Sequence, residues 1–345
     1  MSENINATLQ KIYELIGQGS FPRIKIRERG TKNILYDEQL RQYILGDKFK
    51  TRSLGSVSQS RLFSQLTWMM TIVKMLKETG KTSSQRDIYY MSLNPDYVPF
   101  KDQPEGNELI LDLECLLGTP RELLNIFPDE RALFYGDIKL RFKDSTEEIK
   151  LESFKDGLPI GPNLTEASFF DCKAKKLLVV EKQAVWTRMI EENTYKRDNI
   201  LLLATKGQSP RNARYLINKL SKQFGLDVLI LTDADPWGLS IANVIIFGSA
   251  RLAHLRGLAV PDAKWIGVTP TDVVKFQLPS EPLNDKDKKR VQTLMRDSRC
   301  QTNPWKEELK VFQKNKRKSE IESGSKYGLT WIVDKYLPEK MKEFT

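Results

Sequence analysis

Three acidic residues follow two apolar runs of the sequence, at positions where their carboxylates could bind a metal ion. Glu181 follows the run 176–180, and Asp233 and Asp235 follow the run 228–231. If both runs are strands of a parallel sheet, their carboxyl ends meet at one edge, which is where such sheets bind ligands. A set of oxygen ligands suits Mg²⁺. The spacing therefore indicates a candidate magnesium site formed by Glu181, Asp233 and Asp235.

The same acidic residues allow other interpretations. Asp235 precedes Pro236 and could cap the next helix, with the proline at its first position. Haloacid-dehalogenase-type phosphatases also carry Asp-x-Asp at a strand end, but they place Thr two residues later, where this chain has Trp237. Glycosyltransferases of the Asp-x-Asp type are a further alternative, which a basic chain favours less. The pattern alone leaves these alternatives open.

A tyrosine pair close to an arginine could also do chemistry. Arg86 is four residues from Tyr90 and three from Tyr89, so helical spacing does not choose between the tyrosines. A tyrosine hydroxyl can attack a phosphodiester, but its pKa of about 10 keeps it protonated at neutral pH, so it needs help from a cation. The guanidinium of Arg86 could hold the phosphate. The alternative is that both tyrosines pack in a core.

Helical patterns surround this pair. Apolar residues at helical spacing predict a helix over 60–77 that is ended by Gly80. A second helix is predicted to begin at Thr82 or Ser83, with Gln85 completing a capping box. A third predicted helix and three strand-like runs follow, at 107–117, 123–127, 132–135 and 139–142. Three helices and a small β-wing predict a winged-helix (CAP-like) domain over 56–150, preceded by a helical and irregular extension over 1–55.

A polar stretch with glycine and proline, at 145–163, separates this part from a different pattern. Beyond it, short apolar runs alternate with helical segments. This alternation predicts βαβ units around a buried parallel sheet, in a second domain over 160–345. The predicted strands are 176–180, 199–203, 228–231 and 265–268, and the predicted helices are 183–192, 211–224 and 239–252.

Composition narrows the function classes. The chain has 55 Lys and Arg against 45 Asp and Glu, a net charge of +10, which favours a polyanionic partner. The only histidine, His254, excludes a His-rich zinc site and is expected to have a structural or surface place on a predicted helix. The three cysteines form no CxxC pair, which suits a reducing compartment. Neither a secretory signal nor a membrane-spanning run is visible.

The segment Gly80-Lys81-Thr82 looks like the end of a phosphate-binding loop but lacks its first glycine. The pattern requires glycine at position 75, where the chain has Met75. We therefore expect any ATP use to belong to a partner.

Six segments together, in order, resemble the motifs of one family. Gln85-Arg-Asp-Ile-Tyr-Tyr90 resembles the active-site helix of topoisomerase VI A subunits and their eukaryotic relatives, the meiotic DNA double-strand-break transesterases. Segments 179–182 and 231–238 resemble the two metal-binding motifs of that family's Toprim domain. The segment 205–210, together with Arg214, resembles the family's glycine-rich segment. The family's C-terminal motifs are resembled by 264–270 and by 318–322 together with 336–338.

The resemblance implies a fold and a role for each matched residue. The fold would be α/β plus winged helix, with an N-terminal winged-helix (CAP-like) domain and a C-terminal Toprim domain with a parallel sheet. Tyr90 would be the nucleophile and Arg86 its catalytic partner. The Mg²⁺ ligands would be Glu181, Asp233 and Asp235, and the DNA-binding residues would be Arg131, Lys206, Arg211 and Arg214. The chain departs from the family at Trp237, where His, Tyr or Phe is expected, and at Arg131-Ala132, where Lys-Gly is expected.

The resemblance also implies partners. They are double-stranded DNA, a second copy of the chain whose metal site works with the first copy's tyrosine, and topoisomerase VI B-like and other meiotic accessory proteins. Size and the missing ATPase motif favour the meiotic branch, in which the chain makes DNA double-strand breaks in the nucleus through a 5′-phosphotyrosyl intermediate. A non-cutting DNA-binding scaffold and the A subunit of a religating type IIB topoisomerase remain alternatives.

Two clusters of basic residues, at 286–290 and 314–318, have no assigned role in this scheme. They could follow DNA phosphates or act as nuclear-localisation signals. A charged loop or a solvated helix face is the alternative.

Overall fold

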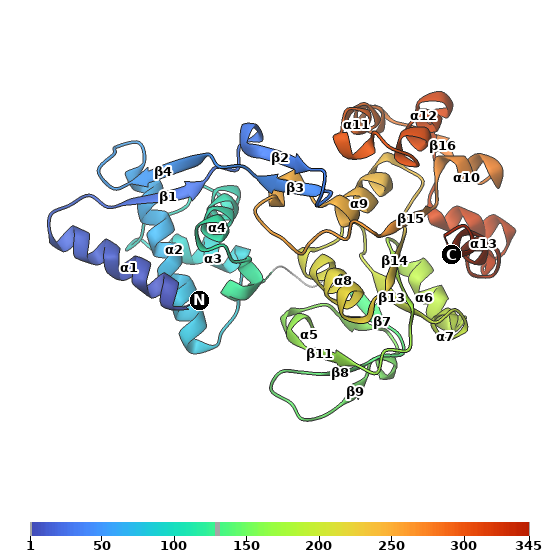
Figure 1. Ribbon diagram of the computed structural model, residues 1–345, viewed down its shortest axis with the longest axis horizontal. Helices are drawn as coiled ribbons and strands as arrows, with labels where there is room; N and C mark the ends of the chain where they lie inside the picture. Colours follow the sequence, from blue (N-terminus) through green and yellow to red (C-terminus); the bar gives the residue numbers. More distant parts are fainter. Residues whose placement is uncertain (1, 128–131, 345) are drawn as a thin grey trace. The chain divides into compact units, whose positions relative to one another are not determined.

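The computed structural model describes residues 2–127 and 132–344 of the chain. Contacts divide the chain into two compact units (Figure 1). Unit 1 comprises Met1–Asp37, Tyr43–Asp129 and Ala250–Arg256, and unit 2 comprises Glu38–Gln42, Glu130–Ser249 and Gly257–Thr345. Among the described helices, none is both long and apolar enough to cross a bilayer.

Unit 1 is mostly helical. Its helices are α1 (Ser2–Gly17), α2 (Ser60–Thr79), α3 (Gln85–Ser92) and α4 (Gln103–Leu117), and 3-10 turns span Thr31–Asn33, Arg121–Leu124 and Ala250–Leu252. Its short strands pair as β1 (Arg23–Arg27) with β4 (Phe49–Ser53), β2 (Ile34–Asp37) with β3 (Gln42–Leu45, of which Tyr43–Leu45 belong to unit 1), and β5 (Ser83–Ser84) with β6 (Ile126–Phe127).

The predicted helix that begins at Ser60 is confirmed as α2, which runs two residues further than predicted, to Thr79. Gly80 ends it in the left-handed conformation, with φ 65°, as the sequence predicts. The third predicted helix, 107–117, is α4. It begins four residues earlier because Asp102 accepts a hydrogen bond from the backbone N–H of Glu105 and caps the first turn.

Part of the first 55 residues packs into the core of unit 1. Helix α1 confirms the helical part of the helical and irregular extension predicted for them, and β1 is a strand that was not predicted. Ile5 and Ile12 of α1 and Ile24 and Ile26 of β1 are buried in one cluster with residues of α2 and α4. In β1 these isoleucines alternate with exposed basic residues, which is the period of a half-buried strand. A five-residue strand shows this alternation only briefly, so the pattern was too short to predict the strand.

Asp112 of α4 is a buried charge that connects this helix to the β1–β4 pair. Its carboxylate oxygens lie 2.7 Å from Lys50 Nζ, 2.9 Å from Arg29 Nη2 and 3.3 Å from Arg52 Nη2. Burial acts to raise the pKa of Asp112, but Lys50 and Arg29 outweigh it and hold the pKa below its ordinary value. The only histidine has a structural place too, because His254 Nε2 lies 3.0 Å from Glu114 Oε2 and its side chain is buried.

Unit 2 contains a six-stranded sheet in the order β10-β7-β13-β12-β14-β15. Its central strands β13 (Ile200–Ala204), β12 (Lys176–Val180), β14 (Asp227–Leu231) and β15 (Lys264–Gly267) are parallel. β7 (Leu133–Tyr135) adds to β13 antiparallel, and β10 (Leu158–Pro159) adds to β7. The four predicted strands are thus confirmed to within a residue at each end.

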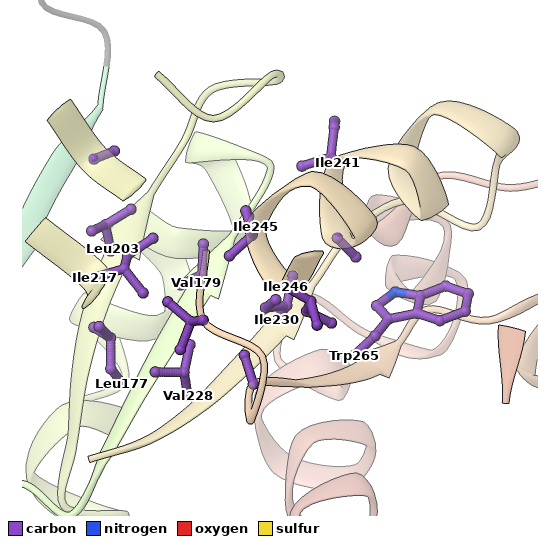
Figure 2. Packing of buried hydrophobic residues seen from close by; sticks show 14 of the residues in the cluster. Leu177, Val179, Leu203, Ile217, Val228, Ile230, Ile241, Ile245, Ile246 and Trp265 are labelled. Atoms are coloured by element: carbon purple, nitrogen blue, oxygen red, sulfur yellow. The ribbon is translucent and has the colours of Figure 1, made fainter. Parts of the chain in front are cut away.

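Helices cover both faces of this sheet. Alternate residues of the parallel strands pack on α8 (Arg211–Phe224) and α9 (Pro236–Phe247). Figure 2 shows two of these strand residues, Val179 and Val228, together with Ile217 of α8 from the same buried cluster. The residues between them face the second cluster, with α6 (Gln183–Glu191), α7 (Thr194–Arg197) and α13 (Leu337–Lys342). Burial on both faces explains why these strands read as continuous apolar runs.

The remaining elements of unit 2 lie outside the central sheet. A three-stranded sheet contains β11 (Ser168–Phe170), β8 (Lys139–Arg141) and β9 (Ile149–Lys150), and β16 (Glu281–Pro282) pairs with β17 (Arg317–Lys318). The other helices are α5 (Pro162–Glu166), α10 (Pro270–Lys275), α11 (Asp285–Met295) and α12 (Trp305–Asn315), with 3-10 turns at Leu151–Ser153, Ser298–Cys300 and Ile321–Tyr327 and a π-helical turn at Ile332–Tyr336.

The runs predicted to form a wing after the third helix lie mostly in unit 2. β7 occupies the second of them and β8 the third, and both pair with strands of that unit. Leu133, Phe134 and Tyr135 are all buried, so β7 is covered on both faces, whereas a wing exposes one. In this part of the chain, unit 1 therefore gives way to unit 2 between the described residues Phe127 and Ala132, before the polar stretch at 145–163 where the sequence predicts the boundary.

Candidate active site

Helix α3 holds the tyrosine pair and begins with a capping box. Ser84 Oγ accepts a hydrogen bond from the backbone N–H of Asp87, and Asp87 Oδ2 accepts one from the N–H of Ser84. The cap predicted at Thr82 or Ser83 with Gln85 is therefore wrong by one or two residues. The reason lies far away in sequence: Ser83 and Ser84 pair with β6, which keeps the chain extended up to Ser84.

The structure distinguishes the two tyrosines, which spacing could not. Tyr90 is 56% exposed, whereas Tyr89 packs against the core of unit 1. The guanidinium carbon of Arg86 lies 5.9 Å from the centre of the Tyr90 ring, within range of a cation–π interaction. The alternative that the tyrosines pack in a core therefore holds for Tyr89 and not for Tyr90. Tyr90 is the member of the pair that a substrate can reach.

The three predicted metal-binding carboxylates gather at the carboxyl end of the sheet in unit 2. Glu181 follows β12, and its Oε2 accepts a hydrogen bond from the backbone N–H of Asp233 at 3.0 Å. Asp233 follows β14, and its Oδ1 accepts one from the N–H of Ile321 at 2.9 Å. Asp235 caps α9, because its Oδ1 accepts hydrogen bonds from the N–H groups of Trp237 and Gly238. The helix-cap alternative for Asp235 is confirmed, and it leaves Oδ2 available for another ligand.

Burial and mutual repulsion shape the charges of this group. Burial, followed by the charge of Asp233, raises the pKa of Glu181 to about 7. Burial also raises the pKa of Asp233 to about 6, and that of Asp235 in the same direction. Carboxylates with raised pKa values hold their charge at a cost, which a bound cation would offset.

The oxygen atoms of these carboxylates are of the kind that binds a divalent cation. Their arrangement in the structure, however, is not yet that of a metal site. All three supply oxygen, which Mg²⁺ prefers. Within residues 2–127 and 132–344, no three His, Cys, Asp or Glu side chains stand arranged to hold a metal ion. One oxygen of each carboxylate accepts from a backbone N–H: Glu181 Oε2, Asp233 Oδ1 and Asp235 Oδ1.

Gly238 allows α9 to begin directly against the Asp233 segment. A Cβ at this position would lie 2.3 Å from the carbonyl oxygen of Asp233 and 3.0 Å from its nitrogen, and neither backbone atom can easily give way. We expect Gly238→Ala to lower the free energy of unfolding by about 1–3 kcal/mol, because overpacking displaces the carboxylates. Urea unfolding measures this cost. Gly17→Ala is the control, since nothing lies within 4 Å there, and an equal cost at both positions would contradict the packing argument.

Trp237, the departure from the family pattern, has a structural role that the sequence did not reveal. Its Nε1 donates a hydrogen bond to Asp287 Oδ1 at 3.1 Å, and Arg290 lies over its ring at 5.2 Å. Asp287 also forms an ion pair with Lys318 at 3.0 Å. Part of each basic cluster thus holds α11 and β17 against the start of α9. Only the contacts of the folded chain could show this.

The residues predicted to contact DNA differ in exposure. Lys206 is exposed in the loop after β13, with a positive φ of 54°. Arg211 and Arg214 are buried in the first turns of α8. Arg131 lies outside the described residues. The DNA-binding role of these four residues stays a prediction.

The fold and site of unit 2 define a Toprim domain, a parallel-containing sheet with acidic residues at its carboxyl end. The family model for the Toprim domain of topoisomerase 6 A subunits/Spo11 matches residues 176–341, and one described as "Type IIB DNA topoisomerase" matches 61–126. The chain belongs to the topoisomerase VI A subunit/Spo11 family.

Relatives match the chain over nearly its whole length. The A subunit of type 2 DNA topoisomerase 6 from Methanothermobacter thermautotrophicus is 41% identical over 333 residues, covering 96% of this chain and 94% of the relative. The proteins of the same name from Archaeoglobus fulgidus and Methanocaldococcus jannaschii are 31% and 33% identical, covering 97% of this chain and 95% and 92% of their own lengths. These relatives are archaeal, so the meiotic branch predicted from the sequence is not confirmed.

Proposed function

We propose that this chain is the DNA-cleaving A subunit of a type IIB topoisomerase, with Tyr90 as its nucleophile. The observation that carries the proposal is the exposure of Tyr90 beside Arg86 on a capped helix. The names of the archaeal relatives support the topoisomerase function. In this proposal the helices of unit 1 supply the DNA-binding part of the predicted winged-helix (CAP-like) domain, with α3 presenting Tyr90 to double-stranded DNA.

The proposed reaction is a transesterification. The Tyr90 oxygen bonds to a backbone phosphorus, and the bond from phosphorus to the 3′ oxygen breaks, which leaves a 5′-phosphotyrosyl link. The phenol gives up its proton and the departing 3′ oxygen takes one up, so no water is consumed and the reverse reaction can reseal the strand. Arg86 would stabilise the charge on the phosphate. Glu181, Asp233 and Asp235 would hold Mg²⁺, which supplies further charge stabilisation.

The proposal includes two protein partners. Two copies of the chain would cut the two strands of one duplex, with the tyrosine of one copy working at the metal site of the other. A topoisomerase VI B-like subunit would supply ATP-driven strand passage, since Gly80-Lys81-Thr82 does not complete a phosphate-binding loop.

The second candidate is the meiotic double-strand-break transesterase, with the nuclear location and meiotic accessory proteins that this role entails. Its support is the size of the chain and the missing ATPase motif. An A subunit that works with a separate ATPase would lack that motif as well, and the archaeal A subunit from Methanothermobacter thermautotrophicus is matched over 94% of its length. The archaeal relatives therefore make the religating subunit the better-supported proposal.

Strand passage tests the choice between these functions. We expect the chain, mixed with an archaeal topoisomerase VI B subunit, ATP and Mg²⁺, to relax supercoiled plasmid DNA and to leave it closed. Gel electrophoresis measures the topoisomers. Linear DNA with protein bound at its 5′ ends and no relaxation would favour the meiotic candidate. DNA binding without any covalent adduct would favour the non-cutting scaffold.

A further inference from the structure

Lys182 places its ammonium group among carboxylates next to the candidate metal ligands. Its Nζ lies 3.2 Å from Asp233 Oδ2, 3.3 Å from Glu320 Oε2 and 4.0 Å from Glu322 Oε2. It directly follows Glu181 and is the residue that precedes α6. None of the roles discussed above uses this side chain.

The segment that carries the two extra glutamates is fixed beside Asp233. Ser319 pairs with Ala234 in an antiparallel bridge, through backbone hydrogen bonds of 2.9 and 3.1 Å. The N–H of Ile321 binds Asp233 Oδ1. Glu320 and Glu322 therefore stand next to Asp233 because the backbone holds them there, and not through a chance approach of flexible side chains.

Both oxygens of Asp233 consequently have a partner within the protein. Oδ1 accepts from the N–H of Ile321, and Oδ2 faces the Lys182 ammonium. A divalent cation bound by Asp233 would approach an oxygen that a positive charge already occupies. Two cations cannot share one oxygen closely without strong repulsion. A lysine ammonium has three N–H donors, so Lys182 can leave Asp233 and still bind a glutamate.

We propose that Lys182 is an internal counter-ion of the metal site, which a divalent cation must displace from Asp233. Glu320, whose side chain is 69% exposed, and Glu322 receive the ammonium when it moves. Lys182 thereby neutralises the acidic cluster before metal binding and lowers the affinity of the site for metal. This inference rests on the proposed metal site of Glu181, Asp233 and Asp235.

Metal binding to the DNA-free full chain tests the proposal without any activity measurement. Calorimetric titration with Mn²⁺ as the probe should show that Lys182→Met binds the ion about tenfold more tightly than the unchanged protein, because a unit charge near the ligand is removed. Glu320→Gln should shift affinity the opposite way, since it removes a negative charge and leaves Lys182 closer to Asp233. Opposite shifts from two changes in one ion pair would not follow from a general loss of structure.

Lys275→Met is the matched control. Lys275 pairs with Glu339 at 2.6 Å on the exposed side of α10, so the substitution changes net charge equally while leaving the Asp233 cluster intact. Its Mn²⁺ affinity should equal that of the unchanged protein. Thermal unfolding gives a second readout. In EDTA, the Lys182→Met protein should melt at a lower temperature than the Lys275→Met protein. Added Mn²⁺ should raise the melting temperature of Lys182→Met by more than that of Lys275→Met.

Asp233→Asn separates failure of this inference from failure of the metal site itself. If Asp233→Asn abolishes Mn²⁺ binding but Lys182→Met leaves the affinity unchanged or weaker, the counter-ion role is overturned and the metal site stands. If Asp233→Asn binds Mn²⁺ as tightly as the unchanged protein, both are overturned. If Lys182→Met does not fold, a Glu320→Gln protein with unchanged or tighter binding overturns the counter-ion role.

Discussion

Tyr90→Phe is expected to abolish covalent protein–DNA adducts while leaving DNA binding and folding unchanged. The substitution removes the attacking oxygen and nothing else. Because Tyr90 is 56% exposed, its hydroxyl contributes little to the core, and the phenylalanine ring still lies within reach of the Arg86 guanidinium. The loss should be complete rather than partial, since phenylalanine offers no nucleophile. Denaturing gels of labelled DNA, run after cleavage with Mg²⁺ present, measure the adduct.

Tyr89→Phe is the control for this experiment, because it makes the same chemical change one residue away. Tyr89 packs against the core of unit 1, so its loss of a hydroxyl should leave adduct formation intact. The ring centres of the two tyrosines are 5.4 Å apart, so the two variants compare hydroxyl groups at neighbouring positions. Adducts that persist in Tyr90→Phe and vanish in Tyr89→Phe would move the nucleophile to Tyr89 and refute the assignment.

Sequence patterns predicted best the elements whose signal is local. The strand 176–180 and the helix 211–224 were predicted with their observed bounds. A continuous apolar run indicates the strand and a long amphipathic pattern indicates the helix, and both patterns lie within the element itself. The run 132–135 was wrongly predicted as part of a wing, because so short an apolar run can form a strand in many sheets. Which sheet takes it depends on pairing with β13, nearly seventy residues later.

In the candidate site, too, local patterns predict the residues but not the contacts that distant segments make with them. Strand ends and the order of motifs predicted Glu181, Asp233 and Asp235 as metal ligands, and the structure places these residues after neighbouring strands at one edge of the sheet. The contacts that modify them come from segments distant in sequence. Lys182 is adjacent to a predicted ligand, yet only the approach of Glu320 gives it a role, and Ile321 reaches Asp233 across 88 positions. No local pattern carries that information.

The stability of unit 1 should depend strongly on Asp112. We expect Asp112→Asn to lower the free energy of unfolding by about 3–5 kcal/mol at pH 7, because it leaves Lys50, Arg29 and Arg52 clustered around a neutral group. The isosteric amide keeps the packing of α4, so the loss reports charge rather than a cavity. Hydrogen exchange of the α4 and β1 amides measures the effect within unit 1.

Glu108→Gln is the matched control, one helical turn before Asp112. Glu108 pairs with Arg29 at 2.8 Å, but its side chain is 53% exposed, so its loss should cost less than about 1 kcal/mol. Acid provides a second check. The pKa of Asp112 is lowered in the folded state, so its contribution is present above the unfolded pKa of about 4 and is lost as the pH falls through the lower folded value. The difference between Asp112→Asn and the unchanged protein should therefore shrink below about pH 4. A difference that stays constant on acidification would show that Asp112 acts through packing and not through its charge.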